Sequence, residues 1–248
     1  MKKTMTLALA LIGLVACKDK EAQANTEDIT FLQAGEQDAW ESLFDGKSFA
    51  GWHAYNGGAE LNGWVIQEEA MHFDPNARTE KKSANIVSDQ EFTDFELSID
   101  WKIAQAGNSG IMWSVVEDAA YGEPYLTGPE IQVLDDAEHP DSFVGDGKHK
   151  AGALYDMIAP AVAAVKPFGE WNTCVIHIDH QENLGWVTLN GTETARFPVQ
   201  GPEWDAMVAG SKFADWGAFG ASVTGRIALQ DHGDKVWYKN IKIKRLHE

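Results

Sequence analysis

The sequence predicts a two-sheet antiparallel β-sandwich of the jelly-roll kind. Three observations lead to this fold: short runs with strand-like composition recur along the chain, turn-forming residues separate them, and few segments keep a helical period for ten residues. Many short strands with little helix bury their apolar faces by packing one sheet on another. The predicted strands are 63–68, 92–104, 110–116, 130–134, 171–180, 185–190, 226–230 and 236–246, and residues 204–208 could form one short helical turn.

The run 92–104 shows the alternation of a strand most clearly. From 95 to 102 its odd positions are apolar and its even positions are polar: Phe95, Leu97, Ile99 and Trp101 against Glu96, Ser98, Asp100 and Lys102. Side chains of a strand alternate between the two faces of its sheet, so this run is typical of an outer strand of a sandwich with one face in water. Its charges need no functional role. The sequence contains no internal repeat and no sign of a second domain.

The run 128–135 alternates in a less ordinary way. Ile131 and Val133 suit a core, whereas Glu130 and Gln132 share the opposite face, and the run begins with a rigid Gly-Pro pair. A carboxylate and an amide in line could face a ligand. The alternative is an ordinary half-exposed strand with a polar outer face.

A second polar pair follows the predicted strand 226–230. Gln230 and His232 flank Asp231, so in extended backbone they share a face. Two strands that each present a polar pair could line one cleft. The alternative for His232 is that it only caps the turn at 231–233, since turns rich in Asp and Gly hydrogen-bond locally.

The N-terminus resembles that of an exported bacterial lipoprotein. Lys2 and Lys3 precede an apolar run that is too short to span a bilayer, and the run ends in the sequence LVAC at 14–17. This predicts a signal peptide over 1–16, lipidation of Cys17, a flexible tether over 17–38 and a single domain over 39–248. The lipid would anchor the protein to a membrane. Lys18 follows the cysteine where an inner-membrane retention signal has Asp, which favours the outer membrane and a periplasmic or cell-surface location.

The net charge restricts the partners. It is −18 at pH 7, and loss of Lys2 and Lys3 with the leader would make it −20. Nucleic acids and polyanionic substrates would be repelled, while neutral sugars are compatible. Ten Trp residues agree with sugar binding, because exposed Trp stacks on sugar rings. The second cysteine, Cys174, lies in an apolar run and is predicted to be buried.

Several short motifs, taken in order, resemble the 3-keto-disaccharide hydrolase family. They are 40–47 (WESLFDGK), 51–52 (GW), 108–111 (NSGI), 128–135 (GPEIQVLD), 151–156 (AGALYD), 166–167 (KP), 169–172 (GEWN), 189–191 (LNG), 227–233 (IALQDHG) and 240–241 (NI). The resemblance covers residues 39–246. Two departures, Lys239 in place of Arg and Glu69-Ala70 in place of an Asp-Gly turn, fall at positions of structural character.

The resemblance implies a concanavalin-like jelly roll with a sugar cleft on its concave sheet. It also implies cleavage of glycosides that are already oxidised to a ketone at C3. Such a ketone acidifies the hydrogen on C2, so a base can remove it and the C1 oxygen can leave by elimination. Water addition then completes a net hydrolysis. The reaction needs a base near C2, an acid near the leaving oxygen and a group that holds the developing enolate.

These needs lead to candidate site residues. We expect Glu130 and His232 to be the acid and base, and Gln132 and Gln230 to hydrogen-bond hydroxyls or the ketone. The remaining candidates for substrate binding are Asn108, whose turn could face the cleft, Lys150 as a cation for the enolate oxygen, and Trp113 and Tyr155 as stacking platforms. Turn formation is the alternative for Asn108, and burial in the core is the alternative for Trp113.

A divalent cation is the one cofactor that the sequence suggests. The loop 139–150 contains two histidines among acidic residues, and Asp135 with His149 could bind Mn, Zn or Fe. The spacing fits no compact metal motif, so a solvated acidic loop, with Asp135 in a turn, is the alternative.

Two classes of function follow. The first is an enzyme that acts on 3-keto-glycosides, and the second is a non-catalytic carbohydrate-binding module displayed on a membrane surface. A conventional glycosidase is disfavoured, because it requires two carboxylates at the scissile bond and Glu130 has no carboxylate partner two or four positions away.

Overall fold

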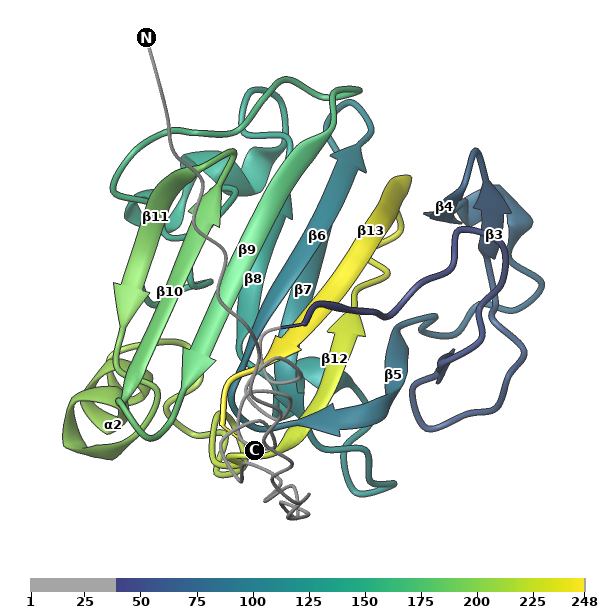
Figure 1. Cartoon of the computed structure of the whole chain (residues 1–248). Helices are drawn as coiled ribbons and strands as arrows, with labels where there is room; N and C mark the ends of the chain where they lie inside the picture. The colour runs from purple at the N-terminus through teal and green to yellow at the C-terminus, as the bar shows by residue number, and fades with distance from the viewer. Residues whose placement is uncertain (1–38, 248) are drawn as a thin grey trace, which may run out of the picture.

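Two antiparallel sheets, packed face to face, form the framework of residues 39–247, the part of the chain that the computed structural model describes (Figure 1). The predicted sandwich is confirmed. The predicted signal peptide, the tether and the lipidation site Cys17 lie outside the described residues. Within 39–247, no helix combines the length and the apolar character needed to cross a membrane.

The larger sheet has the strand order β11-β10-β9-β6-β13-β4-β3, with β1 paired to β13. Its strands are β1 (Glu41–Ser42), β3 (Trp64–Gln67), β4 (Ala70–Phe73), β6 (Phe95–Ile103), β9 (Asn172–Asp179), β10 (Leu184–Leu189), β11 (Thr192–Phe197) and β13 (Val236–Arg245). Strand β6 lies between β9 and β13, and its side chains alternate between buried and half-buried as its sequence predicts. Its apolar face forms the core between the sheets.

The smaller sheet has the strand order β2-β5-β12-β7-β8 and lies behind the larger one in Figure 1. Its strands are β2 (Trp52–Ala54), β5 (Ile86–Phe92), β7 (Asn108–Val115), β8 (Glu130–Leu134) and β12 (Gly225–Leu229). The bounds predicted for β8 are confirmed. Strands β1, β2, β4, β5 and β11 were not predicted, because they are short or lack an alternation: all four residues of β4 are buried.

One α-helix and four short 3-10 helices complete the described elements. They are α2 (Gly201–Ala209), η1 (Pro75–Ala77), η2 (Pro124–Leu126), η3 (Pro140–Phe143) and η4 (Gly145–Gly147). Helix α2 is longer than the single turn predicted. Pro202 favours the start of a helix, because its fixed φ suits the first turn, and Gly210 forms the C-cap. Cys174 is buried and free, as predicted.

Candidate active site

A cavity of about 390 Å³ lies on the outer face of the smaller sheet. Ile131 and Val133 belong to the core between the sheets, so the alternation of β8 turns Glu130 and Gln132 to this outer face. The polar part of the lining comes from β7, β8, the residues after β12 and residue 212, and the aromatic part comes from η2, residue 155 and the segment 213–219. The lining residues are Asn108, Tyr125, Gly128, Glu130, Gln132, Tyr155, Lys212, Phe213, Trp216, Phe219, Gln230 and His232.

Glu130 is the buried acid of this cavity. It is only 7% exposed, and burial raises its pKa to about 8. The cation of Lys212 acts against this shift and the carboxylate of Asp141 adds to it. A carboxyl with a pKa of about 8 is mostly protonated at neutral pH, so it can donate a proton where an ordinary glutamate cannot.

Gly110 makes room for the Glu130 carboxyl. Gly110 and Gln132 are register partners on β7 and β8, and a β-carbon built on Gly110 would overlap Oε1, Cδ and Cγ of Glu130. The carboxyl therefore lies against the backbone of β7 at Gly110. Any larger residue at 110 would displace the acid.

Three amides lie beside the acid. Gln132 Nε2 donates to Asn108 Oδ1 at 3.2 Å, so these two side chains orient one another. The side-chain oxygen of Gln230 is buried and has no hydrogen-bond partner within residues 39–247. A buried acceptor without a partner is unfavourable, and a hydroxyl of a bound ligand would satisfy it.

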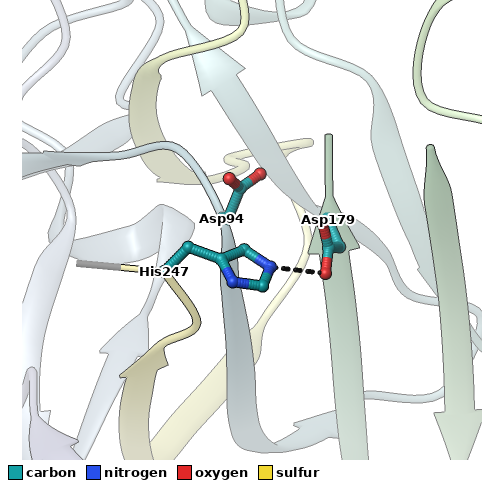
Figure 2. A group of neighbouring side chains, drawn as sticks. All are labelled: Asp94, Asp179 and His247. Atoms are coloured by element: carbon teal, nitrogen blue, oxygen red, sulfur yellow. Dashed lines mark hydrogen bonds and ion pairs between the residues drawn. The ribbon is translucent and has the colours of Figure 1, made fainter. Parts of the chain in front are cut away.

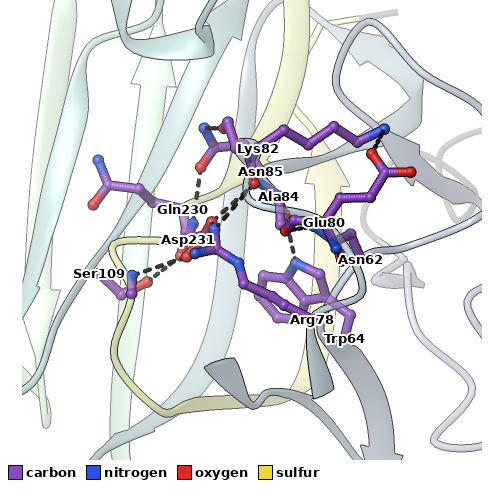
Figure 3. Close-up of polar contacts among 12 residues, drawn as sticks. Asn62, Trp64, Arg78, Glu80, Lys82, Ala84, Asn85, Ser109, Gln230 and Asp231 are labelled. Atoms are coloured by element: carbon purple, nitrogen blue, oxygen red, sulfur yellow. Dashed lines mark hydrogen bonds and ion pairs between the residues drawn. The ribbon is translucent and has the colours of Figure 1, made fainter. Parts of the chain in front are cut away.

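His232 lies at the exposed side of the cavity, with its ring centroid 6.4 Å from that of His139. The turn at 231–233 is fixed by Asp231 instead of His232: its carboxylate accepts from Ala84 N at 3.0 Å and from Gly233 N at 2.8 Å, and pairs with Arg78 (Figure 3). The His232 side chain is therefore not used as the cap of this turn.

A chain of polar contacts starts at Tyr155 and leads away from the cavity. The Tyr155 hydroxyl donates to Asp141 Oδ2 at 3.1 Å, and burial raises the pKa of Tyr155, with the Asp141 charge adding to the shift. Nδ1 of His149 lies 2.9 Å from Asp141 and Nε2 lies 2.9 Å from Asp156. Asp156 in turn accepts from the backbone N–H of Lys212 at 2.7 Å, so this chain of contacts holds both Tyr155 and the Lys212 segment at the cavity.

The segment 212–219 and Tyr125 are lining residues that sequence reasoning missed. Phe213 and Phe219 stack with their ring centroids 3.9 Å apart, and the ring centroids of Trp216 and Tyr125 are 6.0 Å apart. These rings form one aromatic wall. The signal available was the spacing of three aromatic residues in a Gly-rich run, which has no strand or helix period.

Two predicted substrate contacts, Trp113 and Lys150, do not line the cavity. Trp113 is 3% exposed and stacks on Phe197 in the core at 5.8 Å, because it shares the inward face of β7 with Ile111. Lys150 is exposed and is not part of the cavity lining. The structure brings Glu130, Gln132, Gln230, His232, Asn108 and Tyr155 together at the cavity, and their roles there stay predictions.

The predicted metal pair is not assembled either. Asp135 is buried, and its carboxylate accepts from Ala137 N at 3.2 Å, which is the turn-forming alternative, and from Ala106 N at 2.8 Å. Both nitrogens of His149 face other carboxylates. In the described part of the chain the donor group close enough to hold a cation is Asp94, Asp179 and His247 (Figure 2). There His247 Nε2 lies 2.8 Å from Asp179, which ties the end of the chain to β9.

Comparison with known proteins identifies the family. Residues 39–244 match the model of the 3-keto-alpha-glucoside-1,2-lyase-like domain. The chain belongs to this family. A 3-keto-disaccharide hydrolase of Bacteroides thetaiotaomicron is 32% identical, over 99% of this chain and the whole length of that protein.

Solved structures agree with this membership. A proposed glycosyl hydrolase from Parabacteroides distasonis is 33% identical, with a TM-score of 0.77 over 87% of this chain and 97% of that one. A second proposed glycosyl hydrolase from the same organism is 26% identical, with a TM-score of 0.62 over 84% of this chain and all of that one. The family and these relatives support a carbohydrate-active role.

Proposed function

We propose that this protein is a hydrolase that cleaves glycosides carrying a ketone at C3, by removing the C2 proton and eliminating the C1 oxygen. The observation that supports it most is Glu130, a buried acid with a raised pKa, in a cavity whose other polar side chains are neutral amides, two tyrosines, a histidine and a lysine. The names of the family and of the B. thetaiotaomicron relative support the substrate class.

We assign the two acid–base roles on the ground that Glu130 is buried and His232 is exposed. His232, at the exposed side, takes the proton from C2, and the electrons of that bond form an enolate with its charge on the C3 oxygen. The enolate then re-forms the ketone and expels the C1 oxygen, which takes the proton of Glu130. Water adds to the resulting C1–C2 double bond, so the overall change is hydrolysis. Gln230 accepts from a sugar hydroxyl with its unpartnered oxygen.

A conventional glycosidase fits the cavity less well. Retaining and inverting enzymes place two carboxyl groups about 5 to 10 Å apart across the scissile bond. Glu130 is the one carboxyl group in the cavity lining among the described residues. The nearby Asp141 bonds to Tyr155 and His149. A ketone removes the need for the second carboxylate, because it makes C2–H acidic.

The test compares one disaccharide in its 3-keto form and in its unoxidised form. We expect the purified protein to release free sugar from the keto compound alone. Binding of both compounds without turnover would contradict the proposal and favour a carbohydrate-binding module. The variants Glu130→Gln and His232→Ala should each lower turnover roughly 100-fold or more. Glu203→Gln on the exposed face of α2 and His177→Ala on the larger sheet are the matched controls, and should leave turnover unchanged.

We also propose that the protein is exported and anchored by a lipid on Cys17, because its first residues have a basic start, an apolar run and a cleavage box. Mass spectrometry of the mature N-terminal peptide tests this. A diacylglyceryl group on Cys17 is expected, and an intact Met1 would contradict the proposal.

A further inference from the structure

Lys212 is the lysine of the cavity lining, and its amino group is held by aromatic rings. Nζ lies 4.1 Å from the ring centroid of Tyr155 and 5.2 Å from that of Phe213. No ion pair joins Lys212 to a carboxylate among residues 39–247. A cation held on ring faces keeps its N–H groups available for an oxygen of a ligand.

The backbone around Lys212 is fixed at the same time. Its backbone N–H donates to Asp156 Oδ2 at 2.7 Å, and the other oxygen of Asp156, Oδ1, lies 2.9 Å from His149 Nε2. The following rings pack on one another, with Phe213 and Phe219 only 3% and 5% exposed. An anchored main chain and two ring faces therefore hold the amino group at the cavity. Its charge is close enough to act on the buried Glu130.

We propose that Lys212 is a catalytic residue that stabilises the enolate oxygen at C3 of the substrate. This inference rests on the proposed function. When the C2–H bond breaks, its electron pair forms the C2–C3 double bond and the carbonyl electrons move to the C3 oxygen, which becomes negative. Lys212 donates a hydrogen bond to that oxygen without transferring its proton. The C2 proton goes to the base, His232. A fixed cation aimed at a developing oxyanion lowers the barrier.

Lys212 takes the role that the sequence suggested for Lys150. Lys150 directly follows the loop 139–149, but its side chain is exposed and outside the cavity lining. Lys212 reaches the lining from a segment about 60 residues further along the chain. The contacts that hold Lys212, to Tyr155 and to Asp156, both come from the residues just after this loop.

The experiment isolates enolate formation from cleavage. A 3-keto sugar analogue without an aglycone, 1,5-anhydro-3-keto-glucitol, can lose its C2 hydrogen but has no glycosidic bond to cleave. In D₂O the protein should exchange this hydrogen for deuterium, which proton NMR follows. We expect Lys212→Met to slow the exchange roughly 100-fold or more, as loss of an oxyanion donor does, and Lys212→Arg to restore most of it. For cleavage of the 3-keto-disaccharide, kcat should fall and KM should change little.

The matched control is Lys239→Met, because Lys239 also holds its amino group over a ring, that of Trp171 at 4.0 Å, but on the larger sheet. It should exchange at the wild-type rate, and equal melting temperatures will show that all variants fold. Exchange by Lys212→Met within threefold of wild type would overturn the role of Lys212 while leaving the proposed function intact. A wild-type protein that cleaves no 3-keto-disaccharide would instead overturn both.

Discussion

The carboxyl group of Glu130 lies against the α-carbon of Gly110, in the space that any other residue would fill with its β-carbon. The two residues come from neighbouring strands, β8 and β7, which pair in register around Ile111 and Ile131. The position of the acid is therefore fixed by the absence of a side chain on the adjacent strand.

The first prediction concerns Gly110→Ala. The new methyl group must push the Glu130 carboxyl out of place, since both lie on strands that cannot shift without breaking the sheet. We expect turnover of a 3-keto-disaccharide to fall by at least about 100-fold, because displacement of a catalytic group by even 1 Å is costly. The free energy of unfolding should fall by about 1 to 3 kcal/mol, the usual effect of overpacking.

A double variant separates this clash from a general defect. Glu130→Ala removes the carboxyl that the methyl group would meet, so adding Gly110→Ala to it should cost clearly less stability than in the wild-type protein. Gly122→Ala is the control, because nothing lies within 4 Å of its added β-carbon. Equal costs of Gly110→Ala in the two backgrounds, measured by urea denaturation, would contradict the proposed contact.

The second prediction is that Glu130 makes stability depend on pH. Its pKa is raised from 4.5 to about 8 in the folded protein, so below about pH 4.5 the group is protonated in both states and costs nothing. Between these values only the unfolded state releases the proton, so the free energy of unfolding falls as pH rises, by at most roughly 5 kcal/mol in total. Above about 8 the loss is complete.

Glu130→Gln removes this titration and gives the measurement. The free energy of unfolding of the variant minus that of the wild type should rise between pH 5 and pH 8.5, because Gln needs no proton to be buried. Other carboxyls titrate equally in both proteins and cancel in the difference. A difference that stays constant over this range would mean that Glu130 is ionised in the folded protein at neutral pH.

The third prediction uses the same pKa to assign the role of Glu130. If it is the acid, its protonated form is the active one, and kcat/KM should fall tenfold per pH unit above about pH 8. In Glu130→Gln this alkaline limb should be lost along with most of the activity. If activity instead rises with pH up to about pH 8, the two roles are reversed, and Glu130 is the base and His232 the acid.

Periodicity predicted the parts of the site that lie on strands. The bounds of β8 and the outward face of Glu130 and Gln132 follow from an alternation of two, which the backbone of a strand imposes. The same rule, applied to β7, places Trp113 with Ile111 in the core, so the prediction of a stacking platform ignored a signal that was present.

Loops supplied what the sequence did not predict. Lys212 reaches the cavity from a segment without a regular period, and its contacts to Tyr155 and Asp156 join positions more than 50 residues apart. Lys150 lies in a turn, where the direction of a side chain depends on tertiary contacts and not on spacing. The aromatic wall formed by packing of Phe213 on Phe219 had a weak local signal, the spacing of three aromatic residues in a Gly-rich run, and that spacing does not tell which face the rings cover.

The last prediction concerns the ion pair of Arg78 with Asp231, which holds the turn before His232 (Figure 3). The Asp231 side chain is only 2% exposed, and Arg78 is the residue that directly follows η1. Arg78→Met would leave a buried carboxylate with backbone donors alone, so we expect a loss of roughly 3 kcal/mol in the free energy of unfolding. Turnover should fall as well, because Gln230 and His232 flank Asp231.

A surface pair on the larger sheet provides the comparison. Arg196 pairs with Glu193 at 2.6 Å, but both side chains are about half exposed, so Arg196→Met should cost less than about 1 kcal/mol by urea denaturation and leave turnover unchanged. Adding Asp231→Asn to Arg78→Met removes the unpaired charge and should recover part of the lost stability. If Arg78→Met costs no more than Arg196→Met, the buried pair does not hold this turn, and the position of His232 must depend on the hydrogen bonds of Asp231 to Ala84 and Gly233.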